Sequence, residues 1–425
     1  MEVLLCFVEL DASYAGNENG RLARIGIPEQ GLRSPPKQRG AMNHFVESEA
    51  ARAEHAARWL EANTPPHFLA DGAQFREPGL DEVRQWERAL YEAGLAAVSW
   101  PVEYGGQGGT MLGHLAVSKE IGRRALPESV NSIGKEIVGA ILLGLGNEVQ
   151  KCTYLPRIAR MDDIWSQAFS EPQAGSDLAA VTTTARADGA DWRISGQKIW
   201  TSYADRASFC LLLARTGDPV QRYKNLTLII VPLDAPGITV RPIRQIDGSA
   251  EFNEVFFDDV VVPMSGTVGE IGRGWQGAMS VLTVERATNR MYRGWRFENE
   301  VRHLYAVAGH DGVDFQRKIA GFAIDARIVQ RYAEEIAARV CDDRPLETLG
   351  NLMKLHWSEA HQRFASFAIE TLGSERPGEP ATVATARRRF EAIYWRSRSE
   401  TLIAGTSEVQ RSIIADRELR LARAA

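Results

Sequence analysis

The hydrophobic period of this chain changes twice, and these changes constrain the fold more than any other feature. From Asn43 to about Met161, apolar residues recur at three- and four-residue steps, as on the buried face of a helix. Near Asp162 the period becomes two, and short β-rich segments follow, separated by turn residues. After Trp275 the helical period returns and continues almost to the end. The sequence therefore predicts an α+β protein made of a helical domain, a β domain and a helical bundle.

The period changes also predict domain boundaries. We expect an N-terminal helical domain over residues 42–162, a β domain over 163–270 and a C-terminal bundle over 271–425. Residues 14–41 are rich in Gly, Pro, Arg and Gln and have no period. We therefore interpret residues 1–41 as a disordered extension or a misassigned start.

The β-rich segments predict a small β-barrel or sandwich, because no helical segment separates them. A hairpin is predicted over residues 181–195, with its turn at Asp188-Gly189-Ala190-Asp191. Further strands are expected at residues 209–214, 226–232, 238–242 and 255–262. The last part of the chain predicts an antiparallel four-helix bundle. Its helices are expected at residues 275–309, 314–341, 345–373 and 383–421.

Composition excludes several kinds of partner. A net charge of -5 argues against binding to DNA or RNA. The four cysteines have no C-x-x-C spacing, His356 and His361 are five residues apart, and no His-Glu-x-x-His pattern occurs. We therefore expect no metal site, and a reducing, cytoplasmic location. No apolar run reaches the roughly 18–20 residues that span a bilayer, so no membrane segment is expected.

Several motifs occur in a distinctive order. The most informative are Ser170-Glu171-Pro172-Gln173-Ala174-Gly175-Ser176-Asp177 and Gly196-Gln197-Lys198-Ile199-Trp200-Thr201-Ser202. The others are Trp100-Pro101 with Glu103-Tyr104-Gly105-Gly106, Gly269-Glu270 with Gly274-Trp275, Glu285-Arg286, and Gly405-Thr406-Ser407-Glu408-Val409-Gln410-Arg411. In this order and spacing they resemble the acyl-CoA dehydrogenase family over roughly residues 42–425.

The resemblance implies FAD as the cofactor. A flavin needs backbone donors and acceptors around its polar edge and an apolar or aromatic wall against its face. The Ser170-Glu171-Pro172 segment offers exposed amides and a hydroxyl, and Gly175 permits close approach of the backbone. The family positions that lie along or cover the isoalloxazine correspond here to Gln167, Phe169, Ser170, Trp200 and Ser202. Considered without the neighbouring motif, Trp200 is better explained as an ordinary core aromatic residue.

Other matching positions concern the remaining parts of the ligands. Ser176 matches a residue that contacts the pantetheine arm of CoA, although a turn-capping serine explains it as well. Thr406 and Glu408 match positions near the adenosine-pyrophosphate part of FAD, often reached from a neighbouring subunit.

The catalytic base is the main departure from the family pattern. The reaction that the resemblance implies removes an α proton from a CoA thioester while the β hydrogen leaves as hydride to flavin N5, so a carboxylate is expected to face the α carbon. Many members carry that glutamate where this chain has Ala404. Other branches place it on the first bundle helix, where Glu285 matches, and Arg286 beside it is expected to contact the substrate or tune the site. The resemblance also implies that the backbone N–H at Ala404 holds the thioester oxygen, and a backbone donor survives replacement of its side chain.

The sequence therefore predicts an acyl-CoA dehydrogenase, an oxidoreductase acting on a CH–CH group, that converts an acyl-CoA to a trans-2-enoyl-CoA. The resemblance implies an electron-transfer flavoprotein as acceptor, a homo- or hetero-oligomer (dimer or tetramer), and an acyl chain of fatty-acid or steroid side-chain type. Two alternatives stay open. One is a non-catalytic partner subunit of a heteromeric dehydrogenase, and the other is a flavin oxidase or monooxygenase on the same scaffold.

Overall fold

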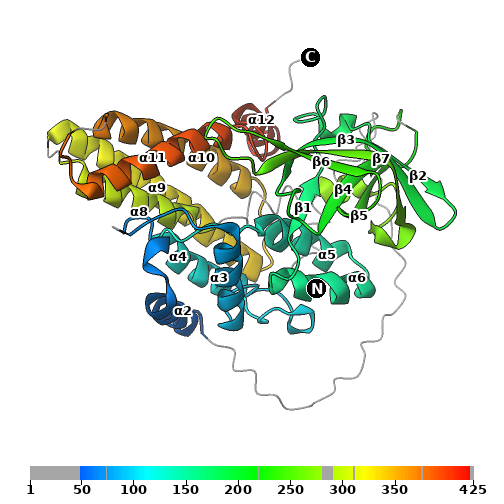
Figure 1. Ribbon diagram of the computed structural model, residues 1–425, viewed down its shortest axis with the longest axis horizontal. Coiled ribbons are helices and arrows are strands. Elements are labelled where there is room, and N and C mark those ends of the chain that lie inside the picture. The colour runs from blue at the N-terminus through cyan, green and yellow to red at the C-terminus, as the bar shows by residue number, and fades with distance from the viewer. Residues whose placement is uncertain are drawn as a thin grey trace, which may run out of the picture.

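The computed structural model describes residues 48–72, 74–218, 220–279, 291–309, 312–374 and 377–421. Within these ranges, helices precede a β-sheet and further helices follow it. Figure 1 shows the long bundle helices at one end, the sheet at the other and the N-terminal helices along one side of both. The prediction for residues 1–41 falls outside the described residues. None of the described helices is long and apolar enough to cross a membrane.

The N-terminal part is helical, as the 3.6-residue period predicts. Gly94, with φ 73°, ends the second of its helices, and its N–H donates to the carbonyl of Tyr91. Thr110 begins the next helix by accepting a hydrogen bond from the N–H of Gly113 at 3.0 Å. The helices are α2 (Glu49–Asn63), α3 (Leu80–Glu92), α4 (Met111–Arg123), the π-helical turn η4 (Ile133–Val138), α5 (Gly139–Leu145) and α6 (Glu148–Ala159).

The middle part is one eight-stranded sheet with the order β6-β7-β3-β2-β4-β5-β8, and β1 pairs with β4 in parallel. The predicted hairpin is confirmed: β2 and β3 are antiparallel, and Asp188 pairs with Asp191 across the turn. The strands are β1 (Trp165–Ala168), β2 (Thr184–Asp188), β3 (Asp191–Ser202), β4 (Phe209–Arg215), β5 (Leu226–Pro232), β6 (Ile238–Ile243), β7 (Phe252–Pro263) and β8 (Thr267–Val268).

The sheet is curled, and both faces of its central strands are buried. On the inner face, Trp192 of β3 and Phe257 of β7 belong to the same buried cluster as Leu212 of β4 and Val231 of β5. On the outer face, Leu211, Leu213 and Leu228 pack against η4, α5 and α6. β4 and β5 therefore read as continuous apolar runs, since neither of their faces meets water.

In the C-terminal part that the structure describes, residues 274–279 are helical, residues 291–292 form a turn, and a bundle of four helices with a fifth helix after it follows. The helix predicted over 275–309 is therefore interrupted at residues 291–292. The bundle helices are α8 (Arg293–Val307), α9 (Val313–Cys341), α10 (Leu349–Leu372) and α11 (Ala381–Glu400), and the fifth is α12 (Ser407–Arg417). The single last helix predicted over 383–421 is wrong in one respect, because the chain leaves the helix at residues 401–406. Ala404 and Gly405 have φ 54° and 86°, and the Thr406 side chain caps α12 by accepting from the N–H of Val409.

Candidate active site

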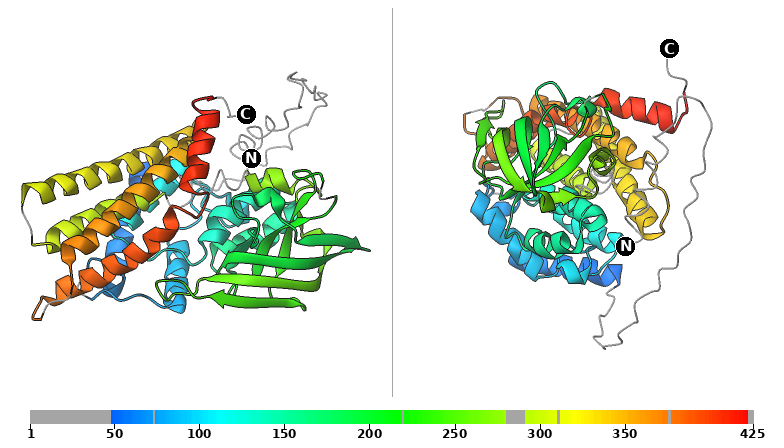
Figure 2. Two further views of the ribbon diagram at one scale, coloured as in Figure 1. Left: turned by 90° about the horizontal axis from the view of Figure 1, so that it is seen from above. Right: turned by 90° about the vertical axis from the view of Figure 1, so that its right-hand side faces the viewer.

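A cleft of about 3140 Å³ lies where the helical part, the sheet and the bundle meet. Its lining comes from the ends of β1 and β3, from α8, α10 and α11, and from the turn at 401–406. Figure 2 shows α12 between the bundle and the sheet, at a steep angle to the bundle helices. The break after α11 therefore brings a stretch of non-helical backbone to the cleft.

The first wall is formed by two chain segments held side by side. The end of β1 continues into Phe169 and Ser170, and both carbonyls are bonded to β3. Lys198 Nζ donates to the carbonyl of Phe169 at 2.8 Å, and the N–H of Ile199 donates to that of Ser170 at 3.0 Å. These bonds place residues 167–170 next to residues 199–202 along the cleft.

A buried ion pair fixes the loop that follows β1. Lys198 and Glu171 are 2.9 Å apart, with side chains 0% and 1% exposed. Glu171 also accepts hydrogen bonds from the N–H groups of Thr182 and Thr183 at 2.7 and 2.8 Å. Burial would raise the pKa of Glu171, but Lys198 and these donors outweigh it and lower the pKa to about 2. Burial lowers the pKa of Lys198 to about 8, against the opposing effect of Glu171, so the pair is charged at neutral pH.

Trp200 is turned toward the cleft by an irregularity in β3. The pairing of β3 with β7 shifts register between Lys198 and Thr201, and Trp200 between them has φ 60°. Its side chain lines the cleft, is 54% exposed and contacts Phe252 edge to face at 6.1 Å between ring centroids. A large aromatic residue held in a left-handed conformation and exposed in a cleft is a feature of binding sites rather than of cores.

The loop at Gly175, Ser176 and Asp177 forms an open part of the cleft wall. All three residues are exposed, and a Cβ added at Gly175 would meet no atom within 4 Å. Asp177 forms an ion pair with Arg222, which lines the cleft from the loop between β4 and β5. The backbone at Gly175 is therefore accessible to a ligand.

The turn at 401–406 is held from behind by buried polar side chains. Lys354 Nζ donates to the carbonyl of Gly405 at 2.7 Å, and Gln410 Nε2 donates to that of Ala404 at 2.8 Å. Gln410 is fully buried and accepts in turn from Asn351 Nδ2 at 2.7 Å. These bonds fix the peptide groups of Ala404 and Gly405 at the edge of the cleft.

An ion pair joins the sheet to the bundle across the cleft. Glu251, which precedes β7, pairs with Arg396 of α11. The hydroxyl of Tyr203 donates to the other oxygen of Glu251 at 3.3 Å, and the Tyr203 N–H donates to the Glu251 carbonyl at 2.7 Å. This contact fixes the position of α11 relative to the end of β3.

The structure brings most of the predicted site residues together. The residues that line the one cleft are Gln167, Phe169, Ser170, Ser176, Trp200, Ser202 and Ala404. Thr406 caps α12 and Glu408 is exposed in its first turn, next to the lining residues Gly405 and Val409 rather than on the wall itself. Glu285 and Arg286 lie outside the described residues.

The sequence did not predict the buried residues that support the cleft walls from behind. Lys198 was part of a motif, but its pairing with Glu171, 27 residues earlier, depends on the sheet. The clamp made by Lys354 and Gln410 joins two helices and leaves no local pattern. One available signal was the presence of charged or amide residues at positions where the helical period predicts burial.

The described residues form a helical domain, a curled sheet and a helical bundle around one cleft. Profiles of the N-terminal, middle and C-terminal domains of acyl-CoA dehydrogenase match residues 39–162, 166–260 and 272–419. The chain thus belongs to the acyl-CoA dehydrogenase family, whose members are flavin-dependent oxidoreductases.

Individual relatives agree with this assignment. The chain is 36% identical to the acyl-CoA dehydrogenase IpdE1 of Mycobacterium tuberculosis over 86% of this chain and 96% of that protein. Among solved structures, the Tcur3481-Tcur3483 steroid ACAD is 28% identical, with a TM-score of 0.77 over 88% of this chain and 97% of that one. The ChsE4-ChsE5 complex from Mycobacterium tuberculosis is 25% identical, with a TM-score of 0.74 over 90% and 100% of the two chains.

Proposed function

We propose that this protein is an FAD-dependent enzyme that dehydrogenates an acyl-CoA thioester to a trans-2-enoyl-CoA. The observation that carries the proposal is the convergence of two strand ends, an exposed tryptophan and a clamped backbone turn on one cleft. Family membership supplies the class of reaction, and the cleft supplies the groups that the reaction needs.

The residues present fit a flavin. Trp200 offers an exposed aromatic face, and the ends of β1 and β3 offer backbone groups beside the hydroxyls of Ser170 and Ser202. Gln167 and Phe169 complete this wall, and Thr406 and Glu408 are assigned to the adenosine-pyrophosphate part of FAD. When bound, FAD supplies the acceptor for the hydride that leaves the β carbon.

Residues of the chain itself remove the α proton and bind the thioester. Glu285 takes the α proton as general base, and Arg286 beside it contacts the substrate or tunes its charge. The N–H of Ala404 holds the thioester oxygen and stabilises the negative charge that develops there. The bonds from Lys354 and Gln410 favour this role, since a donor that is fixed in advance needs no reorganisation during the reaction. Ser176 contacts the pantetheine arm.

The relatives support a proposal for the substrate and the partners. One structural relative carries the description steroid ACAD, so we assign a bulky, steroid-type acyl group to this enzyme. An electron-transfer flavoprotein is the proposed acceptor. The ChsE4-ChsE5 relative is a complex of two chains, which favours an oligomer here as well.

A pair of variants tests the base. Glu285→Gln keeps the size of the side chain and removes its basicity, so the rate of flavin reduction by acyl-CoA should fall by roughly 10²–10⁴-fold while the flavin spectrum is retained. Adding Ala404→Glu to Glu285→Gln should restore part of the rate, because that position carries the base in many members of the family. Unchanged activity in Glu285→Gln would refute its role.

A second candidate is favoured by Ala404 and by the two-chain relatives. The chain would then be the non-catalytic subunit of a heteromeric dehydrogenase. In that case the isolated chain binds ligand without reacting, Glu285→Gln has no effect on the activity of the complex, and the base belongs to the partner.

A further inference from the structure

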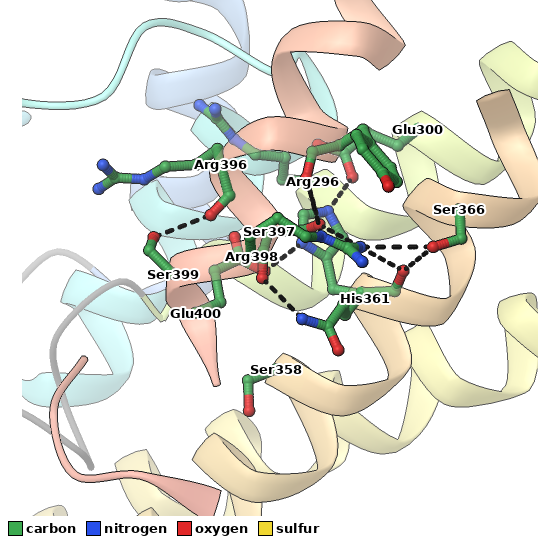
Figure 3. A network of polar contacts seen from close by, with 12 residues as sticks. Arg296, Glu300, Ser358, His361, Ser366, Arg396, Ser397, Arg398, Ser399 and Glu400 are labelled. Atoms are coloured by element: carbon green, nitrogen blue, oxygen red, sulfur yellow. Dashed lines mark hydrogen bonds and ion pairs between the residues drawn. The ribbon is translucent and has the colours of Figure 1, made fainter. Parts of the chain in front are cut away.

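The bundle contains a charged cluster that the proposed mechanism does not use. His361 of α10 lies between Glu300 of α8 and Glu400, the last residue of α11 (Figure 3). Its Nδ1 donates to Glu400 Oε2 at 2.7 Å and its Nε2 donates to Glu300 Oε2 at 2.8 Å. Burial opposes a charged imidazole, but the two carboxylates outweigh it and raise the pKa of His361 to about 10. The imidazole therefore donates from both nitrogens.

The three side chains form part of the cleft wall although they are almost buried. Their side chains are 9%, 4% and 7% exposed for His361, Glu300 and Glu400. All three line the cleft, as do the neighbouring Phe297 and Trp357. The imidazole stacks on Trp357 at 5.7 Å and meets the edge of Phe297 at 5.4 Å between ring centroids. A polar group thus lies within an aromatic stretch of wall.

The cluster presents hydrogen-bond acceptors and no unused donor. Both imidazole nitrogens are engaged with the carboxylates. In the part of the chain that the structure describes, Oε1 of Glu300 and Oε1 of Glu400 receive no hydrogen bond, and both residues line the cleft. A ligand in the cleft that carries a hydrogen-bond donor can therefore bond to these oxygens, and a hydrogen bond to a charged group is stronger than one to a neutral group.

The charge balance favours a neutral donor over a cation. Arg389 is 6% exposed and bonds to the uncharged partners Asn299 and His303, whose pKa is lowered to about 4 by burial and by Arg389. The positive charges of His361 and Arg389 offset the two carboxylates, and two further groups act on the cluster with opposite signs, Arg296 on Glu300 and Asp71 on Arg389. A neutral hydroxyl donates a hydrogen bond without disturbing this balance.

A purely structural role explains the cluster less well. Replacing a buried charged triad with apolar residues is often neutral or stabilising, so burial of these charges does not account for the triad by itself. A structural network would also be expected to satisfy both oxygens of each carboxylate, as Thr182, Thr183 and Lys198 do for Glu171.

We propose that the His361, Glu300 and Glu400 cluster is a specificity subsite that binds a hydroxyl group carried by the acyl part of the substrate. The inference rests on the proposed function, because it places the acyl group in this cleft. The hydroxyl donates to Oε1 of Glu300 or of Glu400, while His361 holds both carboxylates in place. An acyl-CoA of the same skeleton without that hydroxyl leaves the oxygens without a donor.

The test uses pairs of acyl-CoA thioesters that share a skeleton and differ by one hydroxyl remote from the thioester, with its position varied across the panel. Dissociation constants are measured by calorimetry on the flavin-loaded protein, and kcat/KM by flavin bleaching. At least one hydroxylated compound should bind about tenfold or more tightly than its partner, as expected for a hydrogen bond to a charged group. Glu300→Gln and Glu400→Gln should reduce this preference by weakening binding of the hydroxylated member, whereas Glu335→Gln on α9 should leave it unchanged.

Each outcome decides the inference. Equal binding of all pairs by the wild-type protein overturns it, whether or not the variants fold. Stronger binding of ammonium-bearing than of hydroxyl-bearing analogues, or equal loss for both members of a pair in the variants, also overturns it. A binding preference for a hydroxylated thioester without flavin bleaching supports the subsite and contradicts the proposed dehydrogenation, so the two failures are distinct.

Discussion

Lys198 and Glu171 join the two chain segments that form the first wall of the cleft. Because the pair is buried and Glu171 accepts several further hydrogen bonds, the loop after β1 has one preferred conformation. Removing one partner leaves the other charged and buried, which is more costly than losing an exposed pair. Single residues therefore determine the shape of the wall that we assign to the flavin.

This pair gives a prediction about stability and its dependence on pH. Glu171→Gln should lower the free energy of unfolding by about 3 kcal/mol at pH 7, because Lys198 stays buried without its partner. The lowered pKa of Glu171 means that its stabilising effect is complete above pH of about 4.5 and is lost as the pH falls toward 2. The difference in the free energy of unfolding between wild type and variant should therefore shrink as the pH falls from about 4.5 toward 2.

Urea unfolding at several pH values measures this difference. The control is Glu54→Gln, whose ion pair with Arg58 is exposed and should change the stability by less than about 1 kcal/mol. A constant difference across the pH range would contradict the assigned role of Glu171.

At the scale of elements, the sequence predicted most of the fold because its signals are local. The turn at Asp188–Asp191 and the apolar run of β5 were found because hairpin turns and buried strands have short sequence patterns. The break before α12 had a local signal as well, Gly405 followed by Thr406, but continuous helical periodicity outweighed it. The exposure of Trp200 could not be predicted, since it depends on the register between β3 and β7.

The glycines of the Trp100–Gly109 loop give a second prediction. A Cβ at Gly106 would lie 2.2 Å from the carbonyl oxygen of Trp100, which is backbone and cannot move aside. Gly106→Ala should therefore destabilise the protein by about 2 kcal/mol or more, through displacement of the loop. Gly175→Ala is the control, because a Cβ there meets nothing within 4 Å. Equal melting temperatures for the two variants would show that the loop yields to the added methyl group.

For the whole molecule, the cleft exists only because three parts of the chain are held together. Glu251 and Arg396 join sheet and bundle, Gln150 of α6 donates to the carbonyl of Thr267 at 2.8 Å, and Arg296 of α8 donates to the carbonyl of Leu126. Residues far apart in sequence thus meet at one site, which explains why the motifs are spread along the chain. The family profiles match segments between residues 39 and 419, so they also cover all three parts that surround the cleft.

The most direct measurement is the visible spectrum of the purified protein, titrated without oxygen with straight, branched and steroid-type acyl-CoA thioesters. The account predicts a bound flavin whose absorbance is bleached by one class of thioester, which would establish the reaction and the substrate group together. Bound flavin that no thioester bleaches would favour the partner-subunit alternative. Failure to bind flavin after reconstitution with FAD would contradict the account at its centre.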